Sequence, residues 1–318
     1  MCGRKEQRIK VNTQTAVRAD GLFVLHFLIF ALHTYFYRRE ICGFLFIALR
    51  LVRNYILEVT YIKITSALKI TDAHTHLPVD PKNFTEKRDA LLRVMQKNGV
   101  SRGVIISDSE LESSIGSLTD CAELFRGHAD IAVVGGISPY IRYERQLKQL
   151  ETYIAEGLVA GIKLFCGHEP IFLNDPVLTP VYSLAEKYSV PVLFHSGWDN
   201  PQYSAPDVIR QAAEEHPRVR FVCCHCCYPS LTACFHALLG LRNVFFDISS
   251  IADSDASVFK TILEEAIRQS PERFIFGSDY GSCSQKAHLD FAVSLNISEK
   301  NRKLLLYDNA SRLYFNGR

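Results

Sequence analysis

From Lys69 onward the sequence alternates short runs of β-branched and aromatic residues with longer stretches that have helical spacing. Eight of the short runs fit strands, at residues 69–74, 102–107, 131–137, 159–165, 190–195, 219–225, 243–249 and 273–279. Both alternating faces of these runs are apolar, as in parallel strands that are covered on both sides. Eight strand–helix units in about 250 residues match the usual size of a TIM barrel. We therefore predict an α/β fold, a (β/α)8 TIM barrel over residues 69–318.

The stretches between the strands carry signals for helix ends. Two of them, "FTEKRDALLRVMQKNG" and "RYERQLKQLETYIAEG", end in Gly99 and Gly157, which suit helix C-termini. A third, "SAPDVIRQAAEEH", predicts a capping box from Ser204 to Asp207 with Pro206 in the first turn. An open doubly wound sheet is the rival fold. It requires a glycine-rich phosphate loop after the first strand, and "DAHTHLPVD" supplies none.

Residues 1–68 do not share this rhythm, and we predict a separate basic and hydrophobic N-terminal extension. Residues 21–37 are uncharged and largely apolar, and a second apolar run follows at 41–49. The first run is slightly shorter than the roughly 20 residues that span a bilayer, and no small-residue cleavage site follows it. Three interpretations remain open: a membrane anchor or hairpin within residues 21–52, an amphipathic extension packed on the barrel, and a mis-assigned start upstream of the true one.

Charge and cysteine usage restrict the partners and the compartment. Residues 1–68 carry ten Lys and Arg against four Asp and Glu, whereas residues 69–318 carry 26 against 30. The barrel region therefore offers no basic field for nucleic acid, which needs clustered Lys and Arg. Half of the ten cysteines lie between positions 223 and 234, where they are poorly placed to cross-link distant segments. We expect a cytoplasmic protein, with membrane association through the N-terminal region as the alternative.

Side chains that bind metals lie at the predicted carboxyl ends of four strands, where TIM barrels build their active sites. The first strand ends in "DAHTH", and strand alternation points His74 and His76 to the same side. His195 ends the fifth strand, His225 the sixth and Asp279 the eighth. One H-x-H motif is a weak signal. Ligand-type side chains at four strand ends together predict a metal centre.

The motifs "DAHTH", "GIKLF", "VLFHSG", "FGSDY" and "YDNASRLY" resemble the amidohydrolase superfamily, and most closely its amidohydrolase-related branch of single-domain barrels. The resemblance covers nearly all of residues 69–318. It implies a metal-dependent hydrolase, in which His225 is a ligand of a second metal or a catalytic acid or base beside the first. The metal ligands that it implies are His74, His76, His195 and Asp279.

Three imidazoles and one carboxylate suit Zn²⁺ best, although Mn²⁺, Fe²⁺, Co²⁺ and Ni²⁺ also fit. Bound Zn²⁺ lowers the pKa of its water to about 7. We therefore expect one divalent ion, or two, to activate water against an amide, lactone, ester or cyclic C–N bond of a small-molecule substrate. Asp279 would accept the water proton and return it to the leaving group, and His225 would stabilise the oxyanion or donate a proton. Asp72 would fix a histidine tautomer or be a buried polar residue.

Lys163, near the end of the fourth strand, has two interpretations. In binuclear members of the superfamily a lysine at this strand is carboxylated and bridges two metals. The resemblance to the amidohydrolase-related branch favours one metal and a lysine ion-paired in or near the pocket. The alternative function in this branch is metal-dependent decarboxylation of an aromatic or unsaturated carboxylic acid. That reaction needs a basic residue to hold the carboxylate, for which Arg102 and Arg142 are candidates by loop position.

The loops after the strands offer further polar residues that could contact a substrate. These residues are Ser107, Asp108, His168, Glu169, Trp198, Asp199, Tyr280 and Ser282. The histidines in helical or linking segments are expected to be ordinary surface or partly buried residues: His128, His216, His236 and His288.

The stretch "RFVCCHCCYP", residues 220–229, contains a C-x-x-C formed by Cys223 and Cys226. A zinc ribbon needs a second such pair and a redox dithiol needs a helix start, and neither is present here. Alternation would place Phe221, Cys223 and His225 on one face of the strand. We interpret the cysteines as barrel packing, with Cys227 as the one to test for reactivity. A non-catalytic zinc module on Cys223 and Cys226 is the rival class of function.

Overall fold

The computed structural model describes residues 69–110, 112–198, 200–252 and 256–316. It contains one sheet of eight parallel strands in sequential order. The strands are β1 Thr71–Thr75, β2 Arg102–Ile106, β3 Ile131–Gly136, β4 Val159–Leu164, β5 Val192–Phe194, β6 Phe221–Cys224, β7 Val244–Asp247 and β8 Phe274–Ile275. The predicted (β/α)8 TIM barrel is confirmed. The expected N-terminal extension, with its apolar runs, lies outside the described residues.

Backbone hydrogen bonds join the last strand segment to the first. Ala73 N–H donates to Phe276 O over 2.8 Å, and Asp279 N–H donates to His74 O over 2.8 Å. These bonds bring the residues that follow β8 beside β1. The ends of the described sheet therefore meet around the barrel, and side chains from both reach one site.

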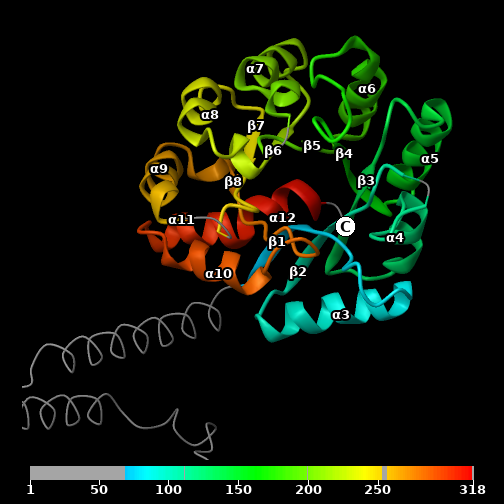
Figure 1. Cartoon of the computed structure of the whole chain (residues 1–318), viewed down its shortest axis with the longest axis horizontal. Helices are drawn as coiled ribbons and strands as arrows, with labels where there is room; N and C mark the ends of the chain where they lie inside the picture. The colour runs from blue at the N-terminus through cyan, green and yellow to red at the C-terminus, as the bar shows by residue number, and fades with distance from the viewer. Residues whose placement is uncertain (1–68, 111, 199, 253–255, 317–318) are drawn as a thin grey trace, which may run out of the picture. The chain divides into compact units, whose positions relative to one another are not determined.

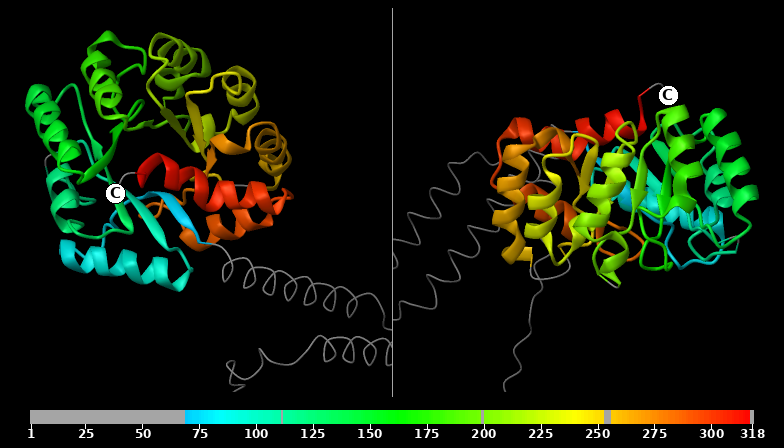
Figure 2. Two further views of the ribbon diagram at one scale, coloured as in Figure 1. Left: turned by 180° about the vertical axis from the view of Figure 1, so that it is seen from behind. Right: turned by 90° about the horizontal axis from the view of Figure 1, so that it is seen from above.

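Helices ring the strands on the outside (Figures 1 and 2). The larger helices are α3 Phe84–Lys97, α5 Tyr143–Ala155, α6 Thr179–Tyr188, α7 Pro206–Glu215, α8 Leu231–Leu238, α9 Ala256–Gln269 and α10 Gln285–Ser294. The shorter ones are α4 Leu118–Leu124, α11 Glu299–Lys303 and α12 Asn309–Tyr314. None of the described helices is both long and apolar enough to cross a bilayer.

The core has two parts, as the two faces of parallel strands require. The barrel interior is filled by small and branched side chains, among them Val104, Val134 and Leu193, and α12 packs against this cluster. The helix α12 lies at the amino ends of the strands, because Arg102 at the start of β2 stacks on Phe315. The opposite, carboxyl ends of the strands therefore form the face that is open for a site.

Two of the three predicted helix ends agree with the structure. Gly99 and Gly157 follow α3 and α5 with φ of 72° and 73°, the left-handed conformation that glycine adopts without strain. The predicted capping box from Ser204 to Asp207 is wrong. Ser204 belongs to the short 3₁₀ turn η3 (Pro201–Ser204), and α7 starts after Ala205 without a side-chain cap. The N-cap position of α7 is Ala205, so Ser204 lies one residue before the position from which its side chain could cap the helix.

Gly277 lies where β8 comes closest to the site. A Cβ at this position would lie 2.3 Å from Asp247 Oδ1 and 2.7 Å from His74 Cβ. We therefore expect Gly277→Ala to displace one of these side chains and to lower the free energy of unfolding by about 1–3 kcal/mol. Denaturant unfolding measures this loss. Gly240→Ala is the matched control, because nothing lies within 4 Å of its Cβ position, and an equal loss there would contradict the steric argument.

Candidate metal centre

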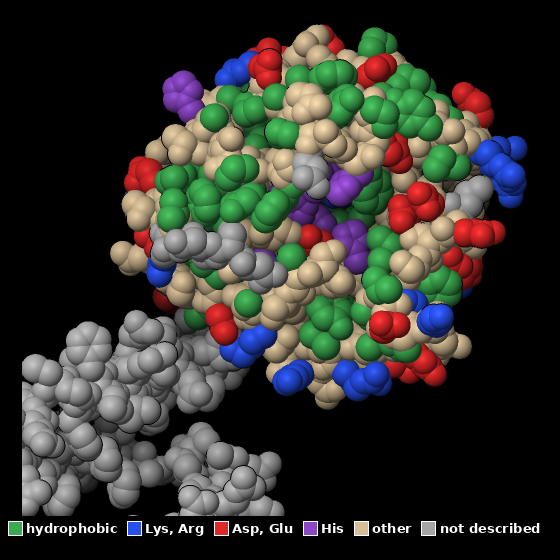
Figure 3. Space-filling view, in the orientation of Figure 1, with side chains coloured by type: hydrophobic (Ala, Val, Ile, Leu, Met, Phe, Trp, Pro, Cys, Tyr) green, Lys and Arg blue, Asp and Glu red, His purple; other side chains and the backbone are tan. Residues whose placement is uncertain are grey.

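Three of the predicted ligands meet at the open end of the barrel. His74 lies at the end of β1, His76 follows that strand, and Asp279 follows β8. The two Nε2 atoms lie 3.5 Å and 3.3 Å from Asp279 Oδ1. Ligand atoms of all three residues lie within 4.8 Å of one another. Figure 3 shows histidine side chains gathered in a hollow on this face.

The other predicted histidines lie against this group. The ring centroid of His225 lies 5.1 Å from that of His74 and 5.0 Å from that of His195. His168, a loop residue after β4, lies 4.2 Å from His195 by the same measure. His195 Nε2 is buried and has no hydrogen-bond partner among the described residues. The structure thus brings together every side chain that was predicted for the metal.

The outward ring nitrogens are held by groups around the site. His74 Nδ1 lies 2.5 Å from Asp247 Oδ2, and His76 Nδ1 donates to Ile106 O over 3.0 Å. His225 Nδ1 lies 2.9 Å from Ser249 Oγ, which also contacts Asp247. Such outer contacts orient metal-binding histidines and fix which nitrogen carries the proton. Here they leave Nε2 of His74 and His76 facing Asp279.

This arrangement fits a bound cation. Because Ile106 O can only accept, Nδ1 of His76 carries a proton, and Nε2 is the nitrogen that faces Asp279 Oδ1. A lone pair and a carboxylate oxygen repel at 3.3 Å unless a proton or a cation lies between them. A divalent ion would accept both donors, and the unpartnered His195 Nε2 would add a third.

The electrostatics of the site favour donors that are ready to bind a metal. Burial lowers the pKa of His225 to about 3 and the pKa of His195 further still, so both rings are neutral near pH 7. Burial raises the pKa of Asp279, but attraction to His74 and the hydrogen bond with His76 outweigh it and hold that pKa far below its ordinary value. Metal ligands must be deprotonated to bind, and the directions of these pKa shifts favour that state at His195, His225 and Asp279.

Asp247 is a functional candidate that the sequence analysis missed. It ends β7, is fully buried, and contacts the His74 ring directly. Asp72 was expected to fix a histidine tautomer or to be a buried polar residue. It is the second, fully buried, and its oxygens accept from Ser278 and Gln285 and from the His74 backbone N–H. A register shift in β1 between Asp72 and Thr75 breaks the alternation on which that expectation rested. The sequence did carry a signal for Asp247, because "FFD" places an aspartate at the carboxyl end of the seventh strand.

The prediction that His225 shares a face with Cys223 is also wrong. β6 ends at Cys224, and the next three residues adopt left-handed backbone, with φ of 62° at His225, 50° at Cys226 and 55° at Cys227. This turn directs the His225 ring into the site. Inside the barrel Cys224 Sγ accepts a hydrogen bond from Lys163 Nζ over 3.2 Å.

A cavity of about 630 Å³ opens above the histidines. Six of its lining residues are among the predicted substrate contacts or the ambiguous lysine: Asp108, Lys163, His168, Glu169, Trp198 and Ser282. Further lining residues were not predicted: Ser109, Glu110, Ile115, Phe165, Ser250 and Cys283. Ser107 and Tyr280 do not line it, and Asp199 lies outside the described residues.

The two candidate arginines do not reach this cavity. Arg102 lies at the other end of the barrel, where it contacts Ser311 and the ring of Phe315. Arg142 lines a neighbouring hollow beside Asp108. Lys163 is the cation that lines the cavity among the described residues. Loop position alone could not distinguish the two ends of the barrel.

A parallel eight-stranded barrel with a buried histidine–carboxylate group at the carboxyl ends of its strands has the architecture of a metal-dependent TIM-barrel enzyme. The sequence profile of the amidohydrolase family matches residues 71–315. The chain belongs to the amidohydrolase family, as the sequence motifs indicated. A comparison with curated protein sequences gives no match.

Solved structures share the fold at low sequence identity. An uncharacterised TIM-barrel protein from Bordetella bronchiseptica has a TM-score of 0.65 and 21% identity, over 77% of this chain and 98% of its own. The 5-carboxyvanillate decarboxylase of Sphingomonas paucimobilis has a TM-score of 0.57 and 14% identity, over 78% and 99%. A dihydroxybenzoic acid decarboxylase from a Polaromonas species, solved with manganese and 2-nitroresorcinol, has a TM-score of 0.57 and 12% identity, over 79% and 98%.

The comparisons bear on the identity of the metal ion and on the type of reaction. Divalent metal chemistry and a small-molecule substrate suit the family and the donor set. Zinc was the first choice, whereas the Polaromonas structure holds manganese, and imidazole and carboxylate donors suit either ion. Several of the matching structures are decarboxylases. Another, from Staphylococcus aureus, is titled a putative amidohydrolase, and hydrolysis, the leading expectation, stays a prediction.

Proposed function

We propose that this protein is a metal-dependent decarboxylase of an aromatic carboxylic acid. Structures of this fold named for that reaction include a 2,6-dihydroxybenzoate decarboxylase in complex with 2,6-dihydroxybenzoate, with a TM-score of 0.58 and 15% identity. At such identity the likeness concerns the fold, so the proposal depends on this chain's own pocket. The residues proposed to hold the metal are His74, His76, His195 and Asp279.

The observation that carries the proposal is the state of Lys163. Its side chain is 2% exposed and lines the cavity. Among the described residues its ammonium makes no ion pair with a carboxylate. Lys163 Nζ donates to Cys224 Sγ and lies 5.5 Å from the centroid of the Phe165 ring. A buried charge without a partner is costly, and a substrate carboxylate entering the cavity would pair with it.

The rest of the pocket suits a flat ring. Phe165 and Trp198 line the cavity, and Trp198 stacks on Tyr228 with ring centroids 4.3 Å apart. Aromatic side chains bind ring substrates through stacked or edge-on contacts. The cavity volume of about 630 Å³ is within the usual range for sites that bind small molecules.

Decarboxylation requires that the ring carbon keep the electron pair of the broken C–C bond and receive a proton, while CO₂ leaves. A divalent ion at the histidine group would supply a Lewis acid for the carboxylate and a neighbouring oxygen. Asp279 is held ionised and faces the cavity. It can therefore accept a proton from a substrate hydroxyl and return it to the ring carbon. Ser250 Oγ donates to Asp279 Oδ2 and keeps the carboxylate oriented.

The direct test follows CO₂ release from a panel of hydroxylated benzoic acids, with Mn²⁺ and Zn²⁺ supplied separately. We expect stoichiometric CO₂ and the corresponding phenol from at least one acid. A parallel panel of amides, esters and lactones is followed for new carboxylate or amine. Hydrolysis in the second panel with no CO₂ in the first would overturn the proposal.

Lys163→Met tests the role of the lysine. We expect KM for the aromatic acid to rise about 10-fold or more, the equivalent of one charge-assisted hydrogen bond. Metal content per chain should stay unchanged, because this lysine is assigned to the substrate. Lys87→Met is the matched control, since Lys87 is equally buried but donates to the carbonyls of Pro78 and Val79 away from the cavity. Loss of one metal equivalent in Lys163→Met would instead indicate a carboxylated, bridging lysine.

Hydrolysis is the second candidate, because a different observation favours it. Asp108, Glu110 and Glu169 line the same cavity, and carboxylates there repel an anionic substrate. Ser109 Oγ donates to Glu169 Oε1 over 2.8 Å, while the buried Oε2 has no partner among the described residues. Under this reading the unpartnered oxygen would accept from an N–H of a substrate amide.

A further inference from the structure

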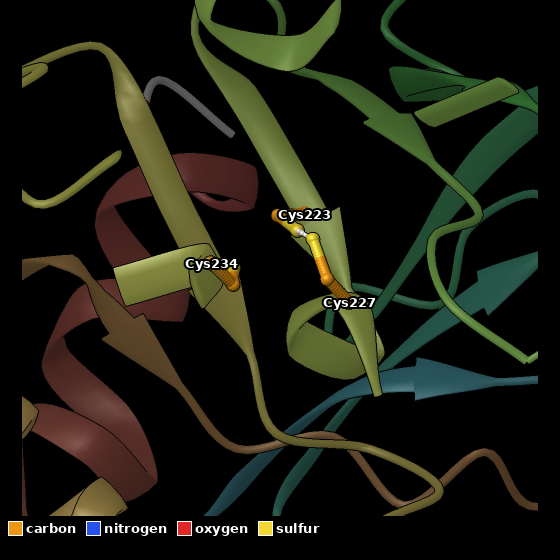
Figure 4. A group of neighbouring side chains, drawn as sticks. All are labelled: Cys223, Cys227 and Cys234. Atoms are coloured by element: carbon orange, nitrogen blue, oxygen red, sulfur yellow. Dashed lines mark hydrogen bonds between the residues drawn. The ribbon is translucent and has the colours of Figure 1, made fainter. Parts of the chain in front are cut away.

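Three cysteine sulfurs meet on the helix side of β6, behind the histidine site. Cys223 lies on β6, Cys227 in the 3₁₀ turn η4 (His225–Cys227), and Cys234 on α8. Their sulfur atoms all lie within 4.8 Å of one another, and the Cys223–Cys227 separation is 3.7 Å. In Figure 4 the Cys223 and Cys227 side chains point toward each other, and Cys234 approaches from a separate element. We call these three residues the cysteine cluster.

The left-handed turn after β6 builds this cluster. If β6 had continued as a regular strand, Cys226 and Cys227 would point to opposite faces of the sheet. Instead the three positive φ angles fold the chain back, so that Cys227 returns beside Cys223. Cys226 points elsewhere, with its Sγ 3.3 Å from Asp247 O. The C-x-x-C pair of Cys223 and Cys226 is therefore not the pair that meets.

The cluster is enclosed and has polar support. The side chains of Cys223 and Cys234 are fully buried, and Cys227 is 5% exposed. Ser196 Oγ lies 3.2 Å from Cys223 Sγ and accepts the Cys227 backbone N–H over 2.9 Å. Among the described residues no histidine or carboxylate joins the cluster. Its donors are thus three sulfurs, with one hydroxyl beside them.

Burial and hydrogen bonds between the thiols shift the pKa values of the cluster in opposite directions. Burial raises the pKa values of Cys223 and Cys234. Hydrogen bonds from these two thiols lower the pKa of Cys227. A metal that replaces the shared protons would meet three sulfurs that already converge.

We propose that Cys223, Cys227 and Cys234 form a second metal site, distinct from the histidine centre, for a thiophilic d¹⁰ ion such as Zn²⁺ or Cu⁺. Thiolates select such ions. Zn–S bonds of about 2.3 Å in tetrahedral geometry place sulfurs about 3.8 Å apart, close to the 3.7 Å between Cys223 and Cys227. Binding releases one proton for each thiol that becomes a ligand. Three-coordinate binding suits Cu⁺, whereas Zn²⁺ would need Ser196 Oγ or water as a fourth ligand.

The test loads the metal-free full-length protein, reduced and under argon, with Co²⁺, Zn²⁺ or Cu⁺ alone. Metal content per chain and near-ultraviolet absorption are measured. We expect a thiolate-to-cobalt charge-transfer band, and one metal equivalent that persists in the His74→Ala/His76→Ala variant. Cys227→Ser and Cys234→Ala should each lose that band and that equivalent. The histidine variant is loaded with Zn²⁺ and with Cu⁺ in separate samples. The ion that stays bound at one equivalent per chain is the one that the cysteine cluster prefers.

The controls separate a metal site from packing. Cys121→Ala removes a buried cysteine on α4, far from the cluster in sequence, and should keep the band and the equivalent. Circular dichroism establishes whether each variant is folded. If Cys227→Ser does not fold, Cys234→Ala provides the test of the cluster instead. Absence of a charge-transfer band in the wild type, or equal metal content in wild type and cysteine variants, would overturn the proposal. So would a Cys223–Cys227 disulfide that persists after treatment with reductant, because it leaves only the Cys234 thiol to bind.

Discussion

His76→Ala is expected to empty the metal centre while the barrel stays folded. His76 Nε2 is one of the donors that converge on Asp279, and its Nδ1 donates to Ile106 O. Loss of an outer partner of a metal ligand typically costs 10–100-fold in affinity or activity. Loss of a ligand itself should exceed that, so we expect a fall of more than about 100-fold in kcat/KM and metal content near zero after dialysis.

Metal analysis and activity on the same preparation check this expectation. His236→Ala is the matched control, because His236 is exposed on α8 and does not line the cavity. It should retain full metal and full activity. Full metal content in His76→Ala would remove His76 from the ligand set. Full activity without metal would contradict the whole assignment of this centre.

Asp247→Asn should weaken metal binding by about 10–100-fold, although Asp247 is not a proposed ligand. The carboxylate accepts from His74 Nδ1 and thereby leaves Nε2 free for the metal. Asparagine keeps the shape but removes the charge that makes the imidazole a stronger donor. If its NH₂ group faces Nδ1, the ring must carry its proton on Nε2 instead, and that nitrogen can no longer bind.

Competitive metal titration against a chelating indicator measures the change in affinity. Asp108→Asn is the control, since Asp108 lines the same cavity but bonds to Ser109 and Ser113 rather than to a histidine. Its metal affinity should equal that of the wild type. Equal losses in both variants would mean that total negative charge in the cavity, rather than the His74 contact, governs binding.

The barrel and the convergence of its histidines were predictable because both depend on simple periodicity. Eight apolar runs define the strands, and the ligand-type residues stand at their carboxyl ends, where any parallel barrel brings them together. His74, His76, His195 and Asp279 all reach one pocket for this reason. No knowledge of loop geometry was needed for that prediction.

Alternation failed wherever the backbone left the regular strand. The register shift in β1 turned Asp72 toward Ser278, and the left-handed turn after Cys224 moved His225 and Cys227 to opposite sides of β6. Neither irregularity contains a glycine that would mark it, since residues 225–227 are His, Cys and Cys. Asp247 was missed for another reason, because its partner His74 lies far away in sequence and only the closed barrel brings them together.

The contacts between the first and last strands also make the metal a reporter of folding order. His74 and His76 belong to the first strand–turn segment of the described chain, and Asp279 follows the last strand. No partly formed sheet that lacks β8 can present all three donors. During refolding, metal uptake should therefore require that the segment after β8 has docked on β1, and free metal should stabilise states with that contact over states without it.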